Sequence, residues 1–178
     1  MPCLRPVEGD EACEEESLIL SSSDPRIEES SPGSAEAKWC LDRYYGELRG
    51  RFDEGFDASK SAVSDAYDFL RPNGVFLVAS LERGPIGCGG VKLTSQDIGY
   101  ITRMWIDPSH RGLGLGRTLL RALENAAREL GCTIVQLETN RSLTGAIQLY
   151  QTSGYREVEP FNDEYYAHYW FEKDLRMD

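Results

Sequence analysis

The 178-residue sequence predicts an α/β (α+β) fold with one mixed central β-sheet and helices packed on its faces. Three observations lead to this prediction. Segments of strand-like composition and segments of helical periodicity follow one another in the order β-β-β-α-β-α-β-β. The length suits a single domain. The composition, with 40% hydrophobic and 28% charged residues, is ordinary for a globular protein that has its own core.

Residues 1–34 differ in composition from the remainder. They contain EACEEE, SSS and ESSPGS and few aromatic residues, so we expect an acidic, flexible N-terminal segment followed by one domain over residues 35–178. Within this segment, Ser17–Leu20 has the composition of a short edge strand. The start of the chain is acidic where a secretory signal would be basic and then apolar, so we expect a cytoplasmic protein.

The first half of the predicted domain begins with a helix. Apolar and aromatic residues from Trp39 to Leu48 recur at helical spacing, which predicts a helix over residues 35–51. A loop and a short helix over residues 59–70 follow. β-Branched and aromatic composition then predicts three strands, at residues 75–79, 86–93 and 98–106.

The second half contains the strongest helical pattern. Apolar residues including Leu119 and Leu123 recur on one face of residues 117–130, and Gly131 ends that helix. A further helix is predicted over residues 142–152, with Ser142 as its N-cap. The remaining strands are predicted at residues 133–137, 155–158 and 165–175.

Charge and cysteine content exclude several classes of protein. The net charge is −11, from 19 basic and 30 acidic residues, which argues against nucleic-acid binding by phosphate neutralisation. No run approaches the ~18 apolar residues of a membrane span, so we expect no membrane partner. Five scattered cysteines and two histidines form neither a disulfide framework nor a metal-ligand pattern, so we expect no metal.

The most informative segment is the glycine turn from Arg111 to Arg117, which connects a predicted strand to a predicted helix. Its alternate glycines, at 112, 114 and 116, allow the backbone N–H groups to point inward and a ligand to approach closely. Together with the positive end of the helix, they form an anion site suited to a pyrophosphate. The spacing matches neither the Gly-Lys-Ser/Thr of a P-loop nor the G-x-G-x-x-G of a dinucleotide fold.

The Arg-x-x-Gly-x-Gly pattern resembles the acyl-CoA pyrophosphate loop of the GNAT superfamily of N-acetyltransferases. Met104–Pro108 is similar to the fourth strand of that superfamily and its exit, and Ala146–Tyr155 is similar to its A-x-x-L-Y-x-x-x-G-[FY] motif. The resemblance covers about residues 74–175, and residues 35–72 more loosely. It implies a mostly antiparallel sheet with helices on both faces and a splayed pair of parallel strands, here residues 98–106 and 133–139.

The resemblance also implies that acetyl-CoA is the co-substrate and lies between the splayed strands. The cofactor-binding residues that it implies are Met104, Trp105 and Ile106 through their backbone, the turn residues Arg111, Gly112, Leu113, Gly114, Leu115, Gly116 and Arg117, and Asn140, Ala146 and Tyr150 on the far wall.

The activity implied is transfer of the acetyl group to a primary amine of a small molecule or peptide by direct attack. Tyr150 stands where the superfamily often has its general acid, with a packed core tyrosine as the alternative. Many relatives have a glutamate where this chain has Tyr100, so Glu138 is the candidate base. A water chain remains open as the base, as does a purely structural role for Glu138.

Aromatic and acidic residues in the variable parts of the superfamily are candidates for the acceptor site, because together they suit an ammonium group. Packing in the core is the alternative for the aromatic members. The substrate-binding candidates are Tyr45, Phe52, Glu54, Tyr100, Tyr165 and His168. The sequence leaves open whether the chain forms a homodimer, and whether it is a non-catalytic acyl-CoA-binding or sensing module instead of an enzyme.

Overall fold

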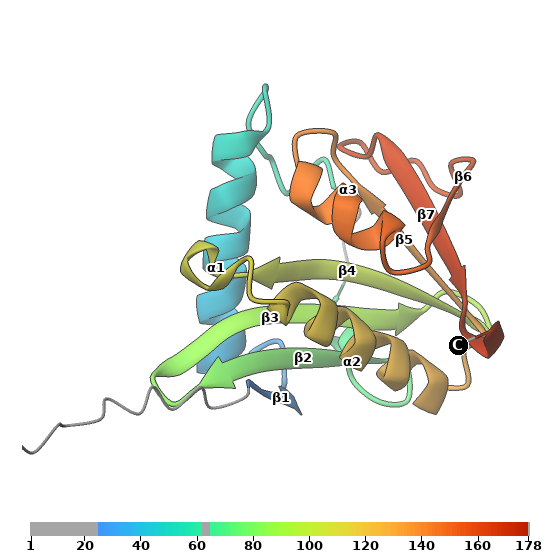
Figure 1. Ribbon diagram of the computed structural model, residues 1–178, viewed down its shortest axis with the longest axis horizontal. Helices are drawn as coiled ribbons and strands as arrows, with labels where there is room; N and C mark the ends of the chain where they lie inside the picture. The colour runs from blue at the N-terminus through green and yellow to red at the C-terminus, as the bar shows by residue number, and fades with distance from the viewer. Residues whose placement is uncertain (1–24, 62–64, 178) are drawn as a thin grey trace, which may run out of the picture.

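The computed structural model describes residues 25–61 and 65–177, and its seven strands form one sheet in the order β1-β2-β3-β4-β5-β7-β6 (Figure 1). All neighbouring strands are antiparallel except β4 and β5, which are parallel. The mixed, mostly antiparallel sheet is therefore confirmed. The strands are β1 Arg26–Glu29, β2 Gly74–Leu81, β3 Gly84–Leu93, β4 Ile98–Ile106, β5 Ile134–Thr139, β6 Arg156–Val158 and β7 Tyr169–Asp174.

Helices cover both faces of the sheet, as expected. Along β2, Val75 and Leu77 belong to the core under α2, whereas Phe76 and Val78 belong to the core under α1, because successive side chains of a strand point to opposite faces. The helices are α1 Ala35–Arg51, α2 Leu115–Glu129 and α3 Thr144–Gln151, with short 3₁₀ turns η1 Ala66–Phe69, η2 Pro108–His110 and η3 Leu175–Met177.

Helix α1 has the bounds that its periodicity predicts. Ser34 caps it, since its hydroxyl oxygen accepts a hydrogen bond from the N–H of Ala37 at 3.1 Å. Ala37 and Cys40 are fully buried against the sheet. The C-terminal half of the helix extends beyond them towards α3, where its side chains line the cavities described below (Figure 1).

Strand β4 is bulged near its middle. Between the pairs Thr102–Gly90 and Trp105–Cys88, β4 contains one residue more than β3. Arg103 lies in this bulge with a φ of 55°, a left-handed conformation that is unusual for a residue with a side chain. The bulge redirects the second half of β4.

Strands β4 and β5 pair only over their first residues. The last parallel pair joins Tyr100 to Gln136, although β4 continues to Ile106 and β5 to Thr139. The two strands therefore separate towards their C-terminal ends, which confirms the splayed parallel pair. The backbone of the separated halves is available to a ligand between them.

Several local predictions differ from the structure. Among the described residues of the predicted helix 59–70, only residues 66–69 are helical, as a 3₁₀ turn capped by Asp65. Helix α3 begins after Leu143 with no capping side chain, because Ser142 is bound to the side chain of Asn140 instead. The last strand begins at Tyr169 and not at residue 165, since residues 165–168 form a loop.

The N-terminal prediction is only partly covered. Ser17–Leu20 lies outside the described residues, as does most of the segment expected to be flexible. Within that segment, however, Arg26–Glu29 forms the edge strand β1, which pairs with β2. Arg71 reinforces this edge, since its guanidinium forms ion pairs with Glu29 and Glu129.

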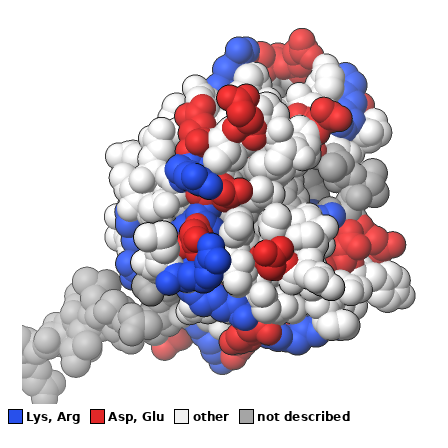
Figure 2. Space-filling model, turned by 90° about the vertical axis from the view of Figure 1, so that its right-hand side faces the viewer, with Lys and Arg blue, Asp and Glu red and all other residues white. Residues whose placement is uncertain are grey.

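Acidic and basic side chains are interspersed on the face of the molecule drawn in Figure 2. Among the described residues, no helix combines the length and the apolar character needed to cross a bilayer.

Candidate active site

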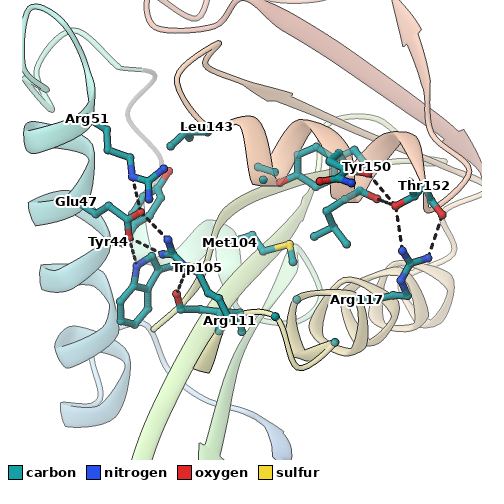
Figure 3. Close-up of a pocket in the computed structure, with 18 of the residues that line it drawn as sticks. Tyr44, Glu47, Arg51, Met104, Trp105, Arg111, Arg117, Leu143, Tyr150 and Thr152 are labelled. Carbon is teal, nitrogen blue, oxygen red and sulfur yellow. Dashed lines mark hydrogen bonds and ion pairs between the residues drawn. The ribbon is translucent and has the colours of Figure 1, made fainter. Parts of the chain in front are cut away.

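Two cavities meet in the cleft between α1 and α3. The first, of about 650 Å³, is lined by the glycine turn, and we call it the loop cavity (Figure 3). The second, of about 520 Å³, is lined by rings from α1 and from two loops, and we call it the aromatic cavity. The residues that line both are Tyr44, Leu48, Met104, Leu143, Ala146 and Tyr150. Two ligands bound in the two cavities would meet at this junction.

The glycine turn gives the loop cavity an anion-binding wall. Gly112 and Gly114 have φ values of 80° and 81°, a left-handed conformation that glycine adopts without strain. Gly114 is also the N-cap of α2 and provides no capping side chain. The first N–H groups of this 15-residue helix are thus left for a ligand, and the helix dipole favours a negative one.

The two arginines of the turn stand on opposite sides of the loop cavity (Figure 3). Arg117 donates to the carbonyl oxygen and to the hydroxyl of Thr152 at 3.0 and 2.9 Å. Arg111 donates to both carboxylate oxygens of Glu47 at 2.9 and 2.6 Å, and its Nε donates to the carbonyl of Ile106 at 2.9 Å. Both guanidinium groups are held by the protein itself.

Glu47 connects α1 to the loop cavity, and the sequence analysis did not single it out. Besides Arg111, it accepts hydrogen bonds from the indole of Trp105 at 2.8 Å and pairs with Arg51 at 2.8 Å. Although burial opposes it, hydrogen bonding from Arg111 and Trp105 holds the pKa of Glu47 below its ordinary value. The sequence signal that could have identified Glu47 is its position three residues after Tyr44, which places both residues on one face of the helix.

The aromatic cavity contains a partly buried carboxylate, Glu138, at the C-terminal end of β5. It accepts a hydrogen bond from the hydroxyl of Tyr100 and another from the side-chain amide of Asn162 at 3.3 Å. Trp170 orients Asn162, because the indole N–H of Trp170 donates to the side-chain Oδ1 of Asn162 at 2.7 Å. Burial, assisted by the charge of Glu164, raises the pKa of Glu138 to about 7 against the hydrogen bonds from Tyr100 and Asn162.

Tyr150 lies at the junction of the two cavities. Its ring packs between those of Tyr155 and Phe171, each at 5.8 Å between centroids, and the residue is only 7% exposed. Burial and then the charge of Glu138 raise the pKa of Tyr150 above its ordinary value, so the phenol keeps its proton at neutral pH. The residue therefore belongs to the core and also lines both cavities.

Most of the residues expected to bind the cofactor line the loop cavity. They are Met104, Trp105, Ile106, Arg111, Gly112, Gly114, Gly116, Arg117, Ala146 and Tyr150. Leu113 and Leu115 do not line it, and Leu113 is 73% exposed, because the turn faces the cavity with its glycines. Asn140 lines the aromatic cavity instead, where its side-chain amide donates to the carbonyl of Tyr166 at 2.7 Å.

The acceptor candidates divide into two groups. Tyr45, Phe52 and Tyr100 line the aromatic cavity. Glu54, Tyr165 and His168 do not line it. Tyr165 is 54% exposed, and its hydroxyl donates to the carboxylate of Glu54 at 3.4 Å. The backbone N–H of His168 donates to the carbonyl oxygen of Thr139. The lining also includes residues that the sequence analysis missed, namely Lys92, Arg103, Phe161, Asn162 and Glu164.

A splayed sheet with an anion site at a helix end, joined to a second cavity for another reactant, is the architecture of an acyl-CoA-dependent transferase. Residues 39–155 match the acetyltransferase (GNAT) family, and the chain belongs to this family. A curated relative, an IAA acetyltransferase from Azospirillum brasilense, is 33% identical over 68% of this chain and 75% of its own length.

Solved structures of GNAT acetyltransferases share the fold. One from Staphylococcus aureus has a TM-score of 0.71 at 18% identity, covering 85% of this chain and 99% of its own. One from Elizabethkingia anophelis, crystallised with acetyl-CoA bound, has a TM-score of 0.59 at 16% identity, covering 84% and 97%. In this chain, the uncapped α2 terminus in the loop cavity suits an anionic pyrophosphate, such as the one that acetyl-CoA carries.

Proposed function

We propose that this enzyme transfers an acetyl group from acetyl-CoA, bound in the loop cavity, to a primary amine bound in the aromatic cavity. The observation that supports this assignment is the meeting of the two cavities at Tyr150, near the partly buried carboxylate of Glu138. Direct attack needs an uncharged amine and benefits from a proton for the leaving thiolate. Glu138 in the aromatic cavity meets the first need, and Tyr150 at the junction meets the second.

Glu138 is the general base in this proposal. An alkylammonium group has a pKa of about 10.4 and is mostly protonated at pH 7, so it must lose a proton before it attacks. A carboxylate with a pKa raised to about 7 accepts that proton more readily than an ordinary glutamate. Tyr100, which replaces the glutamate of many relatives, holds the carboxylate in position through its hydroxyl.

Tyr150 is the general acid. The new bond joins the amine nitrogen to the acetyl carbon, and the bond from that carbon to sulfur breaks. The phenol of Tyr150 then donates its proton to the departing thiolate, and its raised pKa ensures that the proton is present at neutral pH. The new amide nitrogen gives its surplus proton to the phenolate, which restores Tyr150, and Glu138 releases the proton that it accepted to solvent. The position of Tyr150 at the junction supports this role.

The test is release of free thiol from acetyl-CoA in the presence of a broad panel of primary amines. Glu138→Gln should lower kcat about 10²–10⁴-fold with acetyl-CoA binding retained. Glu157→Gln, on the exposed strand β6, is the matched control and should behave as the wild type. Acetyl-CoA binding without thiol release for any amine would contradict the proposal and favour a non-catalytic acyl-CoA-binding module.

A further inference from the structure

The lining of the aromatic cavity is dominated by rings. They come from α1, from the loop that follows it, from β4, from α3 and from the loop before β7: Tyr44, Tyr45, Phe52, Phe56, Tyr100, Tyr150, Phe161 and Tyr166. Several of these rings pack on one another, with centroid distances of 5.0 Å for Phe56–Tyr166, 5.2 Å for Phe52–Tyr166 and 5.6 Å for Tyr45–Phe56. The wall is therefore preformed and offers ring contacts to an aromatic ligand.

The carboxylates in the described part of this lining are Glu138 and Glu164. Asn162 contacts both residues, since its amide donates to the Glu138 carboxylate at 3.3 Å and its side-chain oxygen accepts from the backbone N–H of Glu164 at 3.4 Å. Carboxylates beside aromatic rings suit the ammonium group of an acceptor.

Two cations, Lys92 and Arg103, also line the cavity. The ammonium of Lys92 is 6.0 Å from the ring centroid of Tyr100. Asp68, which is outside the lining, holds Lys92 there at 3.3 Å. Arg103 stacks on the ring of Phe69 at 4.8 Å. A second ammonium on the same ligand that came near these cations would be repelled by them.

We propose that the acceptor is a small primary amine with a single positive charge and an aromatic body, and that Lys92 and Arg103 disfavour polycations. This inference rests on the proposed function and specifies its substrate class. The aromatic body packs against Phe52, Phe56 and Tyr166, and the amine faces Glu138. A free arylalkylamine and an aromatic amino acid share this chemistry, and they differ in a carboxylate that Lys92 would attract.

Matched amines test the class directly. We expect kcat/KM for 2-phenylethylamine to exceed that for spermidine and for kanamycin by at least about 10-fold, and that for 2-cyclohexylethylamine by about 3–10-fold. Phenylalanine in the same assay distinguishes the amino acid from the free amine. Preference for spermidine or kanamycin would overturn the inference and leave the proposed function intact, whereas absence of turnover with every amine would remove the proposed function itself.

Two variants test the residues. Phe56→Leu should raise KM for 2-phenylethylamine about 3–10-fold and change that for n-butylamine much less. Tyr45→Leu serves the same purpose if Phe56→Leu does not fold. Tyr67→Leu is the control, since Tyr67 is 74% exposed and outside the lining. Equal effects of the cavity variants on both amines would overturn the proposed ring contacts.

Lys92→Met should increase kcat/KM for spermidine relative to 2-phenylethylamine by about 10-fold, because the repulsive charge is gone. Lys38→Met, on the exposed face of α1, is the matched control and should leave this ratio unchanged. A ratio that does not move in a folded Lys92→Met variant would overturn the role of Lys92 in excluding polycations.

Discussion

The two cavities are built in different ways. The anion-binding wall of the loop cavity comes from one continuous turn. Its backbone N–H groups and the left-handed conformations of its glycines form the binding surface. The aromatic cavity is built from side chains of α1, α3, β3, β4, β5 and four loops. A backbone site of this kind suits a ligand that never changes, whereas a side-chain site adapts to a particular acceptor by substitution.

Charges are also managed differently in the two cavities. In the loop cavity, both arginines are held by fixed partners, Glu47 and Thr152, so the site presents a preorganised positive edge. In the aromatic cavity, burial raises the pKa of Glu138 to about 7. In the proposed function, the first arrangement serves cofactor binding and the second serves proton transfer. Variants of the two cavities should therefore change different kinetic constants.

The largest effect is expected at the junction. Tyr150→Phe keeps the ring and its packing and removes only the proton donor. We expect kcat to fall about 10²–10⁴-fold, or roughly 3–5 kcal/mol in the barrier, with acetyl-CoA affinity nearly unchanged. Steady-state kinetics together with calorimetry measure both. A folded variant that retains more than about a third of kcat would show that Tyr150 is a packing residue only.

In the loop cavity, Gly114→Val should weaken acetyl-CoA binding. Gly114 has a φ of 81°, which a β-branched residue adopts only with strain of about 1–3 kcal/mol, and the added side chain hinders approach of the pyrophosphate. We expect affinity to fall about 10–100-fold, as measured by calorimetry on a variant whose fold is verified by circular dichroism. Unchanged affinity would show that the pyrophosphate does not lie on this turn.

Glu47→Gln tests the connection between α1 and the loop cavity. The amide cannot receive the two-point, charge-assisted bond from Arg111, so the guanidinium loses its fixed position. We expect acetyl-CoA affinity to fall about 3–10-fold, with the pH dependence of kcat unchanged. Glu36→Gln in the exposed first turn of α1 is the control. An altered pH profile would mean that Glu47 also acts in proton transfer.

The pH dependence should come from the aromatic cavity. Because the pKa of Glu138 is raised to about 7, the carboxylate is protonated below that pH, and kcat should fall about 10-fold between pH 8 and pH 6. Variants of the loop cavity should keep this fall of kcat towards acidic pH. The residual activity of Glu138→Gln should not show it. If kcat of the wild type instead fell with a midpoint near pH 4.5, burial would not set the pKa of Glu138.

The smallest expected effect is on stability. The folded state binds a proton at Glu138 more tightly than the unfolded state, so the destabilisation by the carboxylate is absent below about pH 4.5 and grows until about pH 7. At pH 8, Glu138→Gln should therefore stabilise the fold, by at most about 3 kcal/mol. Thermal unfolding at pH 8 and pH 5 checks this, and a larger gain at pH 5 would contradict it.

Local pattern determined much of the fold. The bounds of α1 and β4 agree with the periodicity of their residues, because burial of one helix face or of alternate strand positions leaves a repeat in the sequence. The glycine turn was also predictable, since a left-handed backbone at Gly112 and Gly114 requires glycine at fixed spacing. Even so, the strand Arg26–Glu29 carries no such pattern, because it is mostly exposed and is held by pairing with β2.

Tertiary structure alone decided the partners of the reactive groups. Tyr100 and Glu138 are 38 residues apart in the sequence, and Glu47 and Arg111 are 64 apart, yet each pair forms a direct hydrogen bond. No local periodicity records such a meeting, because a sequence pattern encodes which side of an element is buried and not what it is buried against. The glycine turn carries its backbone conformation in its own residues, whereas the pKa of Glu138 depends on burial and charges contributed by distant segments.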